Sequence, residues 1–222
     1  MNERLIEIII SSIPKILIPG LTVTIPLTII SFIIGLIIAI AVAEIRILEV
    51  PVLKHIVTFY VWVIRGTPLL VQLYVIYFGL PSVGIIIDAL PSAVIAFSLN
   101  VGAYCSETIR AAILSVPKGQ TEAGYCIGLN YWQIMIRIVL PQAFKVAFPP
   151  LFNSFIGLVK DTSLAANVTV LEMFMAAQRV VATTYEALTL YVEVGIFYLL
   201  FCTILTRIQD FGEKRLAKGQ SV

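Results

Sequence analysis

The chain has 222 residues, of which 59% are hydrophobic and only 13% are charged, and its mean hydropathy is +1.00. Soluble domains carry about 25% charged residues, so this chain lacks the polar surface that a water-exposed globule needs. The composition therefore indicates an integral membrane protein. A net charge of +2 is too small to suggest a nucleic-acid partner, and no run of like charges is present.

Apolar stretches divide the chain into five segments that can cross a bilayer. The first stretch, at ~1.5 Å per residue, is longer than the ~30 Å hydrocarbon core requires. We therefore expect its helix to tilt, or to kink near Pro19 and Pro26. The five expected spans cover residues 16–43, 56–79, 89–110, 146–177 and 186–206.

Two of these segments carry the signal of a break. In the second segment, Gly66-Thr67-Pro68 interrupts the helical pattern beside Arg65. The fourth segment is uncharged only over residues 146–159, which as a helix measure about 21 Å and are too short to cross the bilayer alone. We therefore expect Lys160-Asp161-Thr162-Ser163 to lie at membrane depth in a broken helix that residues 164–177 continue.

Lysine and arginine are distributed unevenly between the two ends of these spans. Ten lie on the side of the 44–55 loop, the 110–145 loop and the C-terminal tail, against four on the other side. The positive-inside rule then places the tail and the long loop in the cytoplasm and the N-terminus outside. The ten are Arg46, Lys54, Arg110, Lys118, Arg137, Lys145, Arg207, Lys214, Arg215 and Lys218; the four are Arg4, Lys15, Lys160 and Arg179.

The long cytoplasmic loop, residues 112–141, carries the most specific motif in the chain. It contains Glu122-Ala123-Gly124, then Gly128, then Ile138-Val139-Leu140-Pro141. This spacing resembles the loop of ABC-importer permeases, whose pattern is E-A-A, three residues, Gly, nine residues, then I-x-L-P. Only Gly124 departs from the pattern, where the family has its second alanine.

The resemblance implies that this loop docks a cytoplasmic ATPase subunit. Its own pattern predicts a helix over residues 118–129, capped by Thr121 and stopped by Gly128, and a second short helix over residues 132–139. The alternative is an amphipathic loop that lies on the lipid headgroups. The residues implied in docking are Glu122, Ala123, Gly124, Gly128, Leu140 and Pro141.

Two further motifs resemble the same family. Residues 65–73 read R-G-T-P-L-L-V-Q-L and residues 160–164 read K-D-T-S-L, as in the polar amino-acid permeases of the ABC superfamily. With the loop motif, they identify the chain as a member of this family of histidine-, glutamine- and arginine-type permeases. The resemblance implies an all-α polytopic membrane protein with five transmembrane helices, the type I ABC importer permease architecture, in a single domain over residues 1–222.

The family resemblance also implies a function and partners. The chain would be the membrane-spanning subunit of an ATP-driven amino-acid importer in the inner or plasma membrane of a prokaryote. We expect no catalytic site, metal or cofactor in this chain, because ATP and Mg²⁺ would bind to the partner ATPase. The implied partners are a cytoplasmic ABC ATPase dimer, a second and identical permease subunit, an extracytoplasmic solute-binding protein, the amino-acid substrate and the lipid bilayer, with no nucleic acid.

Ionisable and polar residues inside the spans are the candidates for a solute path. A charge at the bilayer centre costs about 2.5–3.5 kcal/mol, so it needs a partner or a polar cavity. Purely structural roles stay open: Arg65 could pair with Glu107, Lys160 could neutralise Asp161, and Glu193 could face the headgroups. The candidate substrate-binding residues are Arg65, Gln72, Asn100, Gly102, Tyr104, Glu107, Asp161, Thr162, Ser163 and Glu193.

Three acidic groups against Arg65 favour a basic amino acid as the substrate. The alternative is a secondary transporter or channel subunit that uses the intramembrane carboxylates. Such a protein would not need the docking loop, which distinguishes the two hypotheses. An intramembrane hydrolase built on Asp161 and Glu107 is a weaker alternative. The cysteines Cys105, Cys126 and Cys202 fit no metal or disulfide spacing, and no Walker-type loop is present in the sequence.

Overall fold

The computed structural model describes residues 3–217, which contain helices and connecting turns and no β-strand. The chain begins with one continuous 45-residue helix made of α1 (Glu3–Pro19), the π-helical turn η1 (Gly20–Thr24) and α2 (Ile25–Ile47). It starts well before residue 16, so the sequence-based start is wrong. The expected irregularity near Pro19 and Pro26 is present, as the π-helical turn between these two prolines.

The second segment is sharply bent. Helix α3 (Leu53–Gly66) meets α4 (Leu69–Tyr74), which η2 (Val75–Gly79) and η3 (Leu80–Val83) extend, at 109°. At the break, Thr67 is extended, with φ −124° and ψ 147°. The residue before a proline favours this conformation, so the break predicted at Gly66-Thr67-Pro68 is confirmed.

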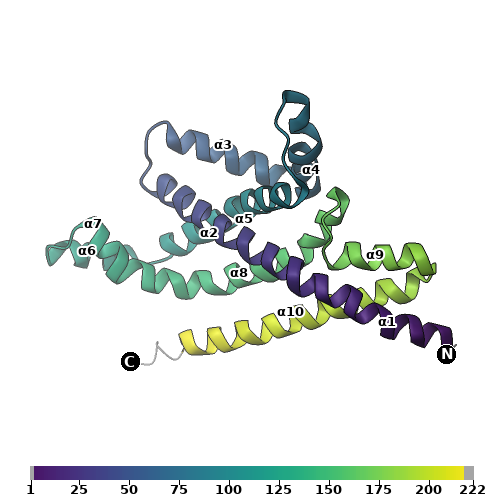
Figure 1. Cartoon of the computed structure of the whole chain (residues 1–222). Helices are drawn as coiled ribbons and strands as arrows, with labels where there is room; N and C mark the ends of the chain where they lie inside the picture. Colours follow the sequence, from purple (N-terminus) through teal and green to yellow (C-terminus); the bar gives the residue numbers. More distant parts are fainter. Residues whose placement is uncertain (1–2, 218–222) are drawn as a thin grey trace.

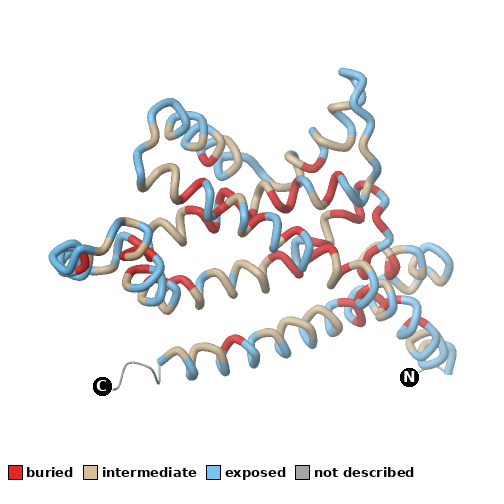
Figure 2. Tube along the Cα trace, turned by 60° about the vertical axis from the view of Figure 1, so that its left-hand side comes forward, coloured by how far each residue is buried: buried red, intermediate tan, exposed pale blue. Residues whose placement is uncertain are grey.

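Helix α5 (Ala89–Leu114) forms the centre of the molecule and packs along α2. In Figure 2 the buried residues run through the middle of the molecule, while its outer turns are exposed. Two glycines allow the close approach: a Cβ on Gly35 would lie 2.6 Å from Val101 Cβ, and one on Gly102 would lie 3.0 Å from Ile38 Cβ. The α2–α5 pair is thus the frame on which the other helices are placed.

The long loop contains α6 (Lys118–Cys126), α7 (Tyr131–Ile134) and η4 (Met135–Val139). Pro117 precedes α6 and Thr121 lies inside the helix, so the predicted Thr121 cap is wrong. Gly128 has φ +82°, which glycine tolerates, and follows the end of this helix. The second predicted short helix is instead the first part of a helix that continues into the membrane-spanning region.

That helix continues as α8 (Leu140–Asp161) and η5 (Thr162–Val168), and after a turn the chain forms α9 (Met173–Thr184) and α10 (Ala187–Ala217). The break at Asp161 is a change from α- to 3₁₀-helix. Residues 164–177 do not continue one span, because Thr169 adopts φ +66° and the chain turns before α9. The last helix also extends well beyond residue 206.

Among residues 3–217, four helices are long and apolar enough to cross a membrane, and the bent pair brings the total to five. This agrees with the predicted all-α membrane fold. In Figure 1, α6, α7 and the C-terminal end of α10 lie at one end of the molecule and the N-terminus at the other. Lys218, counted above with the cytoplasmic tail, lies outside the described residues.

Candidate functional site

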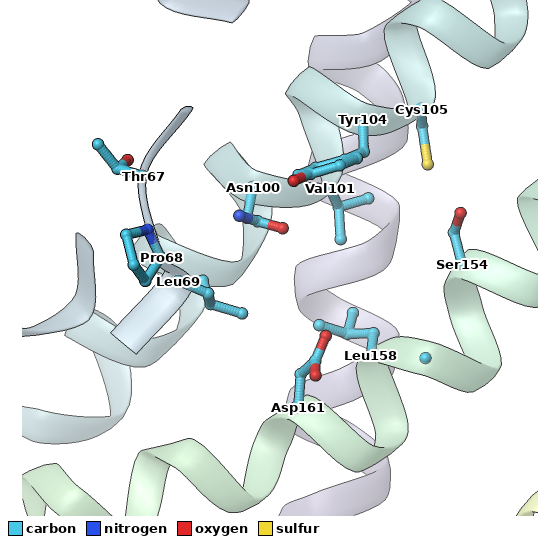
Figure 3. A pocket seen from close by; sticks show the side chains of 11 residues that line it. Thr67, Pro68, Leu69, Asn100, Val101, Tyr104, Cys105, Ser154, Leu158 and Asp161 are labelled. Atoms are coloured by element: carbon cyan, nitrogen blue, oxygen red, sulfur yellow. The ribbon is translucent and has the colours of Figure 1, made fainter. Parts of the chain in front are cut away.

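A cavity of about 360 Å³ opens between the α3–α4 bend, α5 and the end of α8 (Figure 3). The bend contributes one wall, α5 a second and α8 a third, so the motif regions 65–73 and 160–164 meet here on either side of α5. Figure 3 shows Asn100, Tyr104 and Asp161 around the same space. The lining residues are Thr67, Pro68, Leu69, Asn100, Val101, Tyr104, Cys105, Ser154, Gly157, Leu158 and Asp161.

One charged side chain, Asp161, lines the cavity, and another, Arg65, contacts a residue of its wall. The Arg65 guanidinium carbon lies 5.4 Å from the centroid of the Tyr104 ring, a cation–π contact. Asp161 comes from the C-terminal end of α8, and in the described part of the chain its carboxylate forms no ion pair. A solute with both a carboxylate and an ammonium group would find an opposite charge for each.

Two candidate amides are joined to each other. Asn100 Nδ2 donates to Gln72 Oε1 at 3.3 Å, and Gln72 Nε2 donates to the Ile64 carbonyl at 2.8 Å. Gln72 therefore lies behind the bend, while Asn100 also lines the cavity. Gln72 is brought to the site as a support, not as a lining residue.

Several candidates from the sequence lie near the cavity but do not face it. Thr162 is fully buried and donates to the Val159 carbonyl at 2.7 Å, and Ser163 donates to the Lys160 carbonyl at 2.7 Å. Gly102 packs under Ile38. The two hydroxyls are satisfied by their own helix, and the glycine serves the packing of α5 on α2.

Glu107 belongs to a separate ion cluster. It pairs with Arg46 of α2, and its second oxygen accepts from Arg110 Nη2 at 2.9 Å. The pairing of Arg65 with Glu107 that the sequence allowed does not form. Glu107 therefore fixes the end of α5 to the end of α2 beside the long loop.

Glu193 is also remote from the cavity. It lies on α10, is 8% exposed and accepts a hydrogen bond from Ser12 Oγ of α1 at 2.6 Å. It does not face the outer headgroups, as one alternative proposed. Of the four ionisable candidates, only Asp161 lines the cavity, and Arg65 contacts the lining residue Tyr104.

Glu172, which was not a candidate from the sequence, is a fully buried carboxylate. Its oxygens accept from the backbone N–H groups of Phe174 at 2.8 Å and Met175 at 2.6 Å, and from Tyr198 Oη at 3.0 Å. It therefore caps α9 and ties it to α10. The position of this glutamate just before an apolar run could have indicated a helix cap. It was not used because serine, threonine, aspartate and asparagine are the usual capping residues.

The docking loop presents its motif in two parts. Glu122 and Ala123 are exposed, whereas Gly124 is buried against Ile134, whose Cγ1 would lie 2.8 Å from an added Cβ. Leu140 and Pro141 are exposed at the start of α8, and Gly128 ends the turn after α6. Exposed apolar residues surround the motif on the same loop: Tyr125, Ile127, Trp132 and Ile136.

A hydrogen bond connects this loop to the membrane-spanning helices. Tyr131 Oη donates to Glu44 Oε1 on α2 at 2.8 Å, and Asn130 and Gln133 form a capping box at the start of α7. Neither Glu44 nor Tyr131 was a sequence candidate, because neither occupies a position that the family motif defines and their partnership depends on the tertiary fold.

The chain is similar to known membrane components of binding-protein-dependent transporters. Residues 31–218 match the family described as binding-protein-dependent transport system inner membrane component. The L-cystine transport system permease protein TcyB of Bacillus subtilis is 49% identical over 95% of this chain and 90% of its own length. The arginine transport system permease protein ArtQ of the same organism is 38% identical, over 93% and 95%.

A solved structure has the same arrangement of helices. The crystal structure of an amino acid ABC transporter with histidines matches with a TM-score of 0.89 and 30% identity, and the match covers 97% of this chain and 100% of that one. The chain therefore belongs to the family of binding-protein-dependent transport system inner membrane components, as a permease component of an amino-acid ABC importer.

Proposed function

We propose that this chain forms an ATP-driven import path for amino acids and binds the solute in the cavity between the α3–α4 bend, α5 and α8. The observation that carries the proposal is the pair of opposite charges, Asp161 in the lining and Arg65 against the lining residue Tyr104. Every α-amino acid has a carboxylate and an ammonium group, which these two side chains complement. Charge-assisted hydrogen bonds of this kind are about twice as strong as neutral ones.

The charge balance of the cavity supports a polar but uncharged side chain in the substrate. The preference for basic amino acids depended on counting Glu107 and Glu193 with Asp161. Glu107 is neutralised by Arg46 and Arg110, and Glu193 lies against Ser12. With one cation and one anion left, a net-neutral zwitterion is the better match. The 49% identical relative is named for L-cystine, and the 38% identical one for arginine.

The exposed motif of the long loop supports a proposal for the coupling partners. We infer that a cytoplasmic ATPase dimer docks on the loop around Glu122 and Ala123, and that a second copy of this chain completes the import path. An extracytoplasmic solute-binding protein would deliver the amino acid from the opposite side, where the N-terminus lies. ATP closure of the dimer would then move the α2 and α5 ends through the loop, and expose the cavity alternately to each side of the membrane.

Uptake by proteoliposomes that contain this chain and its ATPase tests the proposal. We expect ATP-dependent uptake of radiolabelled cystine or another neutral polar amino acid, with weaker uptake of arginine. Asp161→Asn preserves volume and removes the charge, so it should lower uptake at limiting solute roughly ten- to hundredfold, the value of a charged hydrogen bond of about 1.5–3 kcal/mol. ATPase association should be unchanged.

Three results would contradict parts of this proposal. Stronger uptake of arginine would restore the basic substrate. Normal uptake by Asp161→Asn would assign Asp161 a structural role. Uptake driven by a proton gradient, without any ATPase, would support a secondary transporter instead.

A further inference from the structure

Pro68 leaves an unmet hydrogen bond at the end of α3. In a continuing helix, the carbonyl of Ile64 would accept from the N–H four residues later, which is Pro68, and proline has none. At membrane depth no bulk water is available to replace that donor. Any chain that bends here must therefore supply another donor to the Ile64 carbonyl.

The side chain of Gln72 supplies that donor from the far side of the bend. Its Nε2 lies 2.8 Å from the Ile64 carbonyl oxygen, 3.0 Å from the Thr67 carbonyl oxygen and 3.0 Å from Thr67 Oγ1. Because one amide group contacts both the end of α3 and the linker, the 109° angle between α3 and α4 is held by a side chain as well as by the backbone.

The same amide reaches the cavity through its oxygen. Gln72 Oε1 accepts from Asn100 Nδ2 at 3.3 Å, and both Asn100 and Thr67 line the cavity. Arg65, which lies over Tyr104, is one residue after the carbonyl that Gln72 holds. The position of the cationic group, of Thr67 and of the Asn100 amide thus depends on one side chain that does not itself line the cavity.

We propose that Gln72 is a positioning residue, which fixes the α3–α4 bend and orients Arg65 and Asn100 toward the solute. The expected effect on transport rests on the proposed function, whereas the stability of the bend can be measured without any solute. A residue that only stabilised the fold would change the amount of active protein. A positioning residue changes the affinity for the solute.

Gln72→Met tests this, because methionine has the same length and no donor. In the described structure the backbone N–H groups of residues 71 and 72 donate to the Pro68 carbonyl. In the variant, hydrogen exchange of the full-length protein in detergent should be about tenfold faster at these two N–H groups. In proteoliposomes with the ATPase, the apparent KM for the amino acid should rise about tenfold while the maximal rate is retained.

The matched control is Gln209→Met. Gln209 is a buried glutamine whose amide, like that of the half-buried Gln72, bridges two elements: its Nε2 lies 2.8 Å from Glu213 Oε1 and 3.5 Å from the Pro149 carbonyl oxygen, and it lines neither the bend nor the cavity. It should leave exchange at residues 71–72 unchanged. If Gln72→Met does not fold, Thr67→Val removes one of the contacts and should show a smaller change of the same kind.

Unchanged exchange at the bend in Gln72→Met would overturn the proposal, as would equally faster exchange in Gln209→Met. A lower maximal rate with unchanged KM would reduce Gln72 to a structural role and also overturn it. If the wild-type protein imports no amino acid while Gln72→Met still shows faster exchange at the bend, Gln72 remains the residue that fixes the bend and the proposed function is contradicted instead.

Discussion

The hydroxyl of Tyr131 donates to Glu44 Oε1 at 2.8 Å, and so connects the start of α7, within the docking loop, to the end of α2. Two residues later on α2, Arg46 pairs with Glu107 of α5. The loop, α2 and α5 are therefore joined at the end of the molecule where Figure 1 shows α6 and α7. A force applied to the loop by a partner would reach both helices that frame the molecule.

Tyr131→Phe should loosen the loop without removing its packing. The phenol donates to a carboxylate, so its loss should cost about 1.5–3 kcal/mol of local stability. Hydrogen exchange over residues 118–134 should become at least tenfold faster. Tyr125→Phe is the control, because Tyr125 is exposed on the same loop and the substitution likewise removes one hydroxyl. Equal exchange in the two variants would show that the Glu44 bond does not restrain the loop.

Gly124→Ala should be unfavourable here although the family pattern has alanine at this position. An alanine Cβ would lie 2.8 Å from Ile134 Cγ1 and 3.2 Å from Ile138 Cδ1. Overpacking costs typically 1–3 kcal/mol, against a gain of up to ~1 kcal/mol in helix propensity. We expect a net destabilisation of about 1 kcal/mol in thermal unfolding of the detergent-solubilised protein.

A double-mutant cycle isolates that contact. Ile134→Ala removes the colliding atoms, so its own cost should be smaller by about 1 kcal/mol in the Gly124→Ala background. Additive effects of the two substitutions would mean that the loop accommodates the new methyl group elsewhere. The glycine would then be a neutral departure from the pattern.

The sequence predicted the features that depend on local chemistry. Hydropathy located the spans, Gly66-Thr67-Pro68 marked the bend, and the loop motif identified the family. These features could be predicted because a proline without an N–H, or an apolar run of membrane length, has the same consequence in any fold.

The sequence could not predict which polar residues meet. Glu107, Asp161 and Glu193 look equivalent along the chain, since each is an acid in an apolar segment. Their partners come from other helices: Arg46 for Glu107 and Ser12 for Glu193. Without Glu107 and Glu193 the cavity has one acidic group beside Arg65 and not three, so the expected substrate is neutral and not basic. Helix ends were also misplaced, because packing extends helices beyond their apolar parts.

The orientation predicted from the basic residues can be tested by thiol labelling. In a background without Cys105, Cys126 and Cys202, a cysteine at Ser82 should react with an impermeant reagent added to intact cells. A cysteine at Gln120 should react only after the membrane is opened, because the excess of basic residues predicts that its loop is cytoplasmic. Both positions are exposed, so reactivity reports on the side and not on burial. The reverse pattern would invert the topology.

Glu122→Lys should uncouple the ATPase from transport. Glu122 is exposed on α6, and it is the only acidic residue between Glu107 and Asp161 in the chain. It is therefore the one carboxylate that this loop offers to a donor on a partner. Removing one member of a charge pair that becomes buried on binding costs about 2–5 kcal/mol, so ATP-dependent uptake should fall at least ~thirtyfold.

The membrane-spanning fold should be unaffected by Glu122→Lys, because the side chain is exposed and makes no hydrogen bond or ion pair with the described residues. The amount of protein in the membrane and its unfolding temperature should therefore match the wild type, while ATPase co-purification in detergent should decrease. Glu122→Gln keeps an acceptor oxygen and loses only the charge, so its uptake and its ATPase co-purification should lie between those of the wild type and of Glu122→Lys. Wild-type uptake by Glu122→Lys, with full ATPase co-purification, would show that the partner binds the exposed apolar residues of the loop and not this carboxylate.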